Sequence, residues 1–89
     1  MGAVTETIRN KLATAFAPER LEVVDDSDKH KGHAGAREGG ESHFTVVVVS
    51  QGFAGLGRVE RQRRVNAALA DELAGPVHAL SIKALAPGD

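Results

Sequence analysis

The sequence contains no cysteine, no tryptophan and no tyrosine, and its aromatic residues are three phenylalanines. Without cysteine the chain can form no disulfide and no thiolate nucleophile, and it cannot build a cysteine cage for zinc or an iron–sulfur cluster by itself. No apolar run approaches the roughly 18 residues that a membrane-spanning helix needs. Since no N-terminal segment has the pattern of a signal peptide, we expect a cytoplasmic protein without a membrane partner.

The sequence also lacks an excess of either charge, because 11 Lys and Arg residues balance 12 Asp and Glu residues to a net charge of −1. This balance argues against electrostatic binding of nucleic acid by the chain as a whole. The length of 89 residues predicts a single domain over 1–89 with a thin core. Four histidines form the one enrichment in the composition.

Hydrophobic spacing predicts two main helices. Val4, Ile8, Leu12, Ala15 and Phe16 form one helical stripe, so we expect a helix over 4–16 that Thr5 or Thr7 caps and Pro18 ends. A second helix is expected over 58–74, since Gly75 and Pro76 follow it. The segment 51–57 between the last valine run and this helix predicts a glycine-rich turn.

Three strands are expected over 21–25, 43–50 and 77–85. The middle one contains four consecutive valines and is apolar on both faces, which indicates a strand that is covered on both sides or central in its sheet. The element order is therefore α-β-β-α-β. This order predicts an α+β fold in which helices cover one face of a three-stranded sheet.

The segment 27–42 between the first two strands is unusually long for a connection, and such segments are generally functional or disordered. It contains His30 and His33, an HxxH pattern on glycine-rich backbone. Imidazole suits zinc, copper and iron, but two ligands do not make a site. From the pattern alone, solvated surface histidines are the more common interpretation.

Two further histidines lie at strand ends. His78 has the parity of Leu80 and Ile82, so we expect it to point toward the buried face, either as a ligand or as a partly buried histidine bonded to backbone. His43 has the opposite parity from Phe44 and is expected to project from the end of its strand.

Four arginines, Arg58, Arg61, Arg63 and Arg64, gather at the start of the second helix, with Glu60 as the only acid from 58 to 66. Positive charge at a helix N-terminus opposes the helix dipole, which favours an anion docking there. The arginines either contact phosphate or form a solvated outer face. The nearby glycines of 52–55 match the GxxG loop of KH domains only weakly, because neither residue between them is basic.

No catalytic set emerges from the sequence. The carboxylates of Asp25, Asp26 and Asp28 cluster in a polar turn, without the apolar surroundings that raise a carboxyl pKa for acid catalysis. The serines stand in no nucleophile-elbow pattern. We therefore expect a protein that is not an enzyme.

Three segments together resemble the BolA family: LEVVDDSDKH (21–30), ESHFTVVVVSQGFAGLGRVERQRRVNAAL (41–69) and ELAGPVHALSI (72–82). The resemblance covers nearly the whole chain and implies a class-II KH-like α+β fold. It also implies a non-enzymatic partner of a monothiol glutaredoxin that shares a [2Fe–2S] cluster with that protein and with glutathione. Such proteins act in iron–sulfur trafficking or in iron and redox sensing.

The family motif assigns one metal ligand to His78, and the other ligand to the segment between the first two strands. In this chain without cysteine that ligand is a histidine. Alignment forward from the first strand favours His30, and counting back from ESHF favours His33. The resemblance implies no cluster in the isolated protein, which we expect to be a monomer or a weak dimer. Because imidazole binds metal only when unprotonated, the shared cluster should be released more readily as pH falls.

A second hypothesis also follows from the resemblance, because some bacterial members are regarded as DNA-binding transcription regulators. The arginine-rich helix, with Arg58, Arg61, Arg63 and Arg64, would then contact DNA. Gln62 stands where relatives commonly have histidine between two arginines, which weakens the analogy with their helix surface.

Overall fold

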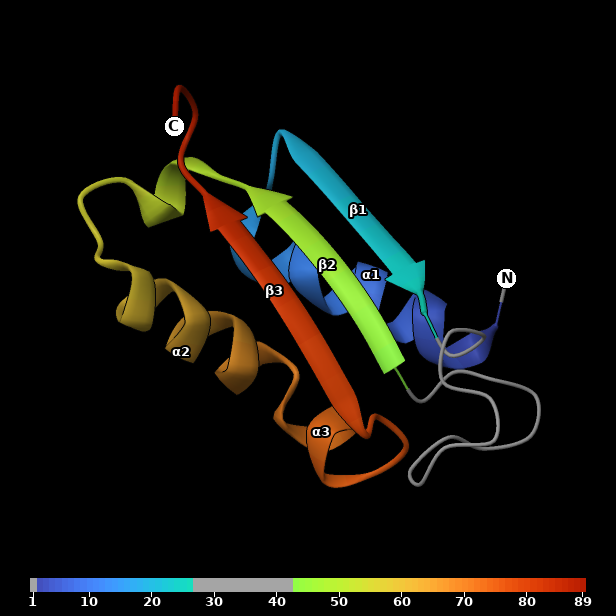
Figure 1. The fold of residues 1–89 in the computed structure, drawn as a ribbon. Coiled ribbons are helices and arrows are strands. Elements are labelled where there is room, and N and C mark those ends of the chain that lie inside the picture. Colours follow the sequence, from blue (N-terminus) through green and yellow to red (C-terminus); the bar gives the residue numbers. More distant parts are fainter. Residues whose placement is uncertain (1, 27–42) are drawn as a thin grey trace.

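The computed structural model describes residues 2–26 and 43–89, and its elements confirm the predicted α+β fold (Figure 1). In chain order they are α1 (Ala3–Phe16), β1 (Arg20–Asp25), β2 (His43–Val49), the 3-10 turn η2 (Gln51–Phe53), α2 (Arg58–Ala68), α3 (Ala70–Ala74) and β3 (Ala79–Leu85). The segment with His30 and His33 lies outside the described residues. In the described part of the chain, no helix is both long and apolar enough to cross a membrane.

The three strands form one sheet with β2 in the centre. β1 pairs with β2 in antiparallel fashion, and β3 pairs with β2 in parallel. Phe44, Val46 and Val48 are buried, whereas Val47 and Val49 on the other face are partly exposed. Figure 1 shows α1 and α2 on the same face of the sheet. β2 is therefore central in its sheet, and among residues 2–26 and 43–89 the helices α1 and α2 cover one of its faces.

The α1 helix packs its apolar stripe under the sheet. Ile8 and Leu12 are completely buried, and Val4 and Phe16 pack against the same core. Ala15, which the spacing also placed on this stripe, is exposed. The core thus includes the stripe positions Val4, Ile8 and Leu12, whereas the last turn of the helix is partly exposed to solvent.

The ends of α1 differ from the capping that the sequence suggested. Gly2 occupies the N-cap position, and the Thr7 hydroxyl donates to the Ala3 carbonyl inside the first turn. At the other end Ala17 adopts the left-handed conformation, with φ 43°, while its N–H donates to the Ala13 carbonyl. Pro18 follows directly and ends the helix as predicted.

The helix predicted over 58–74 is divided at Leu69, which separates α2 from α3 with φ −108° and ψ 21°. Leu69 is 1% exposed, and its carbonyl still accepts the N–H of Leu73. No proline or glycine stands at the break, where the leucine is buried in the core. Glu72 then ties α3 to α1 through Lys11, at 2.9 Å. Hydrogen bonding to Glu72 raises the pKa of the Lys11 ammonium.

Candidate functional site

His78 lies immediately before β3 and is exposed, so the predictions that it starts the strand and is partly buried were wrong. Alternation within a strand applies only once the strand begins, and here it begins at Ala79. Ala79 pairs with His43 in the parallel register. His78 therefore stands at the end of the sheet where β2 starts.

His43 is 6% exposed, and it does not project freely from its strand as the sequence suggested. Its ring lies 5.3 Å from the ring of His78, measured between centroids, with 58° between the planes. Local sequence pattern does not predict that these two histidines are neighbours, because only the register between β2 and β3 brings them together. The site thus holds a buried imidazole beside an exposed one.

The chain returns to this same end of the sheet on both sides of segment 27–42. The Asp26 N–H, just before the segment, donates to the carbonyl of His43 at 2.7 Å. The hydroxyl of Thr45 donates to the Asp26 carboxylate. Both attachment points of the segment that carries His30 and His33 are thereby fixed at the sheet end where His78 precedes β3.

The donors at this site are too few to enclose a metal ion. Across residues 2–26 and 43–89, no group of three or more His, Cys, Asp or Glu side chains is arranged to hold one. His43 and His78 offer imidazole nitrogens, which are suitable ligands for iron. These residues fit a metal cluster only as part of a ligand set that other groups complete.

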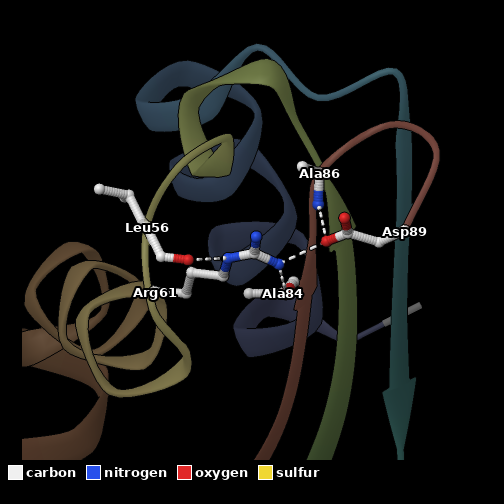
Figure 2. A network of polar contacts seen from close by, with 5 residues as sticks. All are labelled: Leu56, Arg61, Ala84, Ala86 and Asp89. Atoms are coloured by element: carbon white, nitrogen blue, oxygen red, sulfur yellow. Dashed lines mark hydrogen bonds and ion pairs between the residues drawn. The ribbon is translucent and has the colours of Figure 1, made fainter.

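Arg61 is not a solvated residue of an outer face but the centre of a polar network (Figure 2). Its side chain is 16% exposed. Nε donates to the Leu56 carbonyl at 2.9 Å, and Nη1 donates to the Ala84 carbonyl at 3.2 Å and to the Asp89 carboxylate at 2.6 Å. Arg61 therefore joins the start of α2 to the end of β3 and to residue 89.

Asp89 completes this network. Its carboxylate also accepts the backbone N–H of Ala86 at 2.9 Å. The Ala86 N–H and, after it, the Arg61 guanidinium lower the pKa of the Asp89 carboxyl, because both stabilise the ionised form.

The other three arginines of the predicted cluster are exposed. Arg64 pairs with Glu60 one turn away, at 3.2 Å. Arg58 and Arg63 lie at the surface of the same helix. The structure therefore does not present the four arginines as one set, because Arg61 is engaged with the fold.

The glycine turn before α2 is anchored in the core. Phe53, one of the two residues between its glycines, is completely buried, with its ring 4.9 Å from that of Phe16. The Ser50 hydroxyl donates to the Phe16 carbonyl at 2.7 Å and accepts the Gly52 N–H at 3.1 Å. This turn links α1 to β2, and its buried phenylalanine does not match a loop that clamps nucleic acid.

Residues 12–89 match the profile of the family described as BolA-like protein. The chain is 51% identical over 87 residues to BolA-like protein 1 of Pongo abelii, an alignment that covers 98% of this chain and 61% of that protein. It is 49% identical over 79 residues to the DNA-binding transcriptional regulator BolA of Vibrio cholerae, which covers 89% of this chain and 71% of the regulator. Neither name describes an enzyme. This chain spans less than two thirds of the primate protein.

Among solved structures, the BolA domain of SufE1 from Arabidopsis thaliana is similar to this one with a TM-score of 0.88 and 41% sequence identity. The superposition covers 98% of this chain and 95% of that domain. The arrangement of α1, the three strands and the helices before β3 is thus shared with solved relatives.

Proposed function

Because this chain belongs to the BolA family, we propose that it is a non-enzymatic partner of a monothiol glutaredoxin that co-ligates a [2Fe–2S] cluster through His78. The observation that carries the proposal is the position of this exposed imidazole. It lies against buried His43, at the sheet end where segment 27–42 leaves and rejoins the described chain. The protein would act in cluster trafficking or in iron and redox sensing, in the cytoplasm.

An exposed histidine suits a cluster that arrives on another protein, because its ring is accessible without unfolding. The packed ring of His43 limits the orientations that the His78 ring can take on one side. A cluster held partly by neutral imidazole carries less negative charge than one held by thiolates alone, which raises its reduction potential. The thiolates would come from the glutaredoxin cysteine and from glutathione.

The second ligand of this chain is proposed to be His30, with His33 as the alternative. Both belong to the segment that the structure anchors at Asp26 and His43. A ligand on a long connection between two fixed points is compatible with a cluster that another protein delivers.

The proposal is tested by titrating the protein into a monothiol glutaredoxin loaded with a [2Fe–2S] cluster and glutathione. Circular dichroism in the visible range follows the cluster. We expect the wild type to change the shape of the spectrum and His78→Ala to abolish that change. His30→Ala and His33→Ala identify the second ligand. Ser81→Ala, an exposed position on β3, is the matched control. An unaltered spectrum with His78→Ala would contradict the proposal.

A second candidate function is DNA binding, favoured by the name of the Vibrio cholerae relative and by the exposure of Arg58, Arg63 and Arg64. If the protein binds DNA through phosphates, the logarithm of the binding constant should fall linearly with the logarithm of the salt concentration. Because Arg61 holds the fold together, the informative variant is the double reversal Arg63→Glu and Arg64→Glu, which should abolish binding. Binding that ignores both salt and this double reversal would remove the hypothesis.

A further inference from the structure

A cleft of about 390 Å³ lies between α2 and β3, lined by residues near the C-terminal end of that strand. Its lining includes three cations, Arg58, Arg61 and Lys83, together with apolar Leu56, Ile82 and Leu85. His78 precedes the other end of β3. At about 3.3 Å per strand residue, roughly 13 Å separate His78 from Ile82, the nearest β3 residue of the lining. The cleft is thus distinct from the proposed cluster site.

Asp89 shows which chemistry Arg61, a lining residue of the cleft, accepts. Its carboxylate contacts Arg61 at 2.6 Å, and this arginine is one of the lining residues (Figure 2). The Asp89 side chain is 39% exposed, whereas the Arg61 side chain is 16% exposed. The acid is therefore more exposed than the arginine that it contacts, so a carboxylate from another molecule can compete with it for Arg61.

One wall of the cleft is the outer edge of a strand. β3 stands at the end of the β1-β2-β3 order. The carbonyl of Leu85 accepts from the N–H of Ser50, which follows β2, whereas the carbonyl of Ala84 points away and accepts from Arg61. In a parallel strand this alternation also turns the backbone of Ile82 outward. Such an edge can pair with an extended peptide.

We propose that this cleft binds an extended acidic segment of a partner protein, one carboxylate of which replaces Asp89 on Arg61 while its backbone pairs with the outward edge of β3 at Ile82. Arg58 and Lys83 at the cleft favour further acidic side chains on the segment. Leu56 and Leu85 favour apolar side chains between the acidic side chains of the segment. Asp89 is then a built-in competitor for the site. This inference does not depend on cluster binding, because it uses the other end of β3.

The test measures binding of a fluorescein-labelled octapeptide of alternating Asp and Val by fluorescence polarisation. Removing the competitor with Asp89→Asn should tighten binding, and Lys83→Glu should weaken it, each by roughly two- to fivefold for an exposed ion pair. Arg63→Glu changes the net charge as much as Lys83→Glu but lies outside the cleft lining, so it is the charge-matched control. Amide exchange at Ile82 should slow when the peptide binds.

Three results would overturn the inference: unchanged or weaker affinity with Asp89→Asn, equal weakening by Lys83→Glu and Arg63→Glu, or displacement of the peptide by an equal concentration of inorganic phosphate. The last would show recognition of an anion alone. His78→Ala should leave peptide affinity unchanged, so failure here and failure of the cluster proposal are separate outcomes.

Discussion

The buried ring of His43 packs against the exposed ring of His78, with centroids 5.3 Å apart. The two histidines occupy the adjacent starts of β2 and β3 but differ in their surroundings. The packed member is part of the fold, and the exposed member is available for chemistry.

This difference predicts unequal effects on stability. His43→Ala should lower the free energy of unfolding by about 1–3 kcal/mol, as for other buried side chains that lose their packing. His78→Ala should change it by no more than about 0.5 kcal/mol. Urea denaturation measures both values, and a larger loss with His78→Ala than with His43→Ala would contradict this division.

Arg61→Ala should lower the free energy of unfolding by about 1–3 kcal/mol, because the Leu56 and Ala84 carbonyls lose a charged donor in a part-buried position. Arg64→Ala is the matched control, since it removes the same side chain from an exposed i, i+4 pair with Glu60. Such a pair contributes about 0.3–0.5 kcal/mol. Equal losses for the two variants in thermal or urea unfolding would refute a structural role for Arg61.

The Asp89 carboxyl makes stability depend on acidity. Its pKa is lower in the folded protein, first by the Ala86 N–H and then by Arg61, so the unfolded chain binds this proton more readily. The stabilisation is therefore present above about pH 4 and is lost as pH falls through the folded pKa. Unfolding curves of wild type and Asp89→Asn should differ at neutral pH and converge in acid. A difference of the same size at every pH would show that the carboxylate charge is not its source.

Ala17→Gly should raise the free energy of unfolding by about 1 kcal/mol, because Ala17 has φ 43° and an L side chain is disfavoured in that region. Ala13→Gly, in the exposed last turns of α1, should lower it by about the same amount. Melting temperatures that move in the same direction for both variants would contradict the prediction.

Local sequence pattern predicts the type and order of the main helices and strands of this fold. Apolar spacing around Ile8 and Leu12, the stop at Pro18 and the valine run of β2 all act within a few residues, so their consequences are visible in the sequence. Centrality of β2 was one of the two interpretations that its apolar faces allowed, and the structure selects it.

The candidate site depends on contacts between distant residues, which local pattern does not report. His43 meets His78 through the register of a parallel strand pair, and Arg61 meets Asp89 because the chain after β3 folds back. The break at Leu69 also has no proline or glycine to predict it from the sequence. Sequence named His78 and Arg61 as important but assigned the wrong surroundings to both.

The pairing of β2 also determines the order in which the chain can fold. His43 pairs with Ala79, 36 positions further along, and the closest pair between β1 and β2, Asp25 with Phe44, is 19 positions apart. The sheet therefore has no tight hairpin to start from, and closing such loops is what slows folding. Stopped-flow refolding should take about milliseconds or longer rather than microseconds. During synthesis, β2 can therefore complete its pairing only after β3 has emerged from the ribosome.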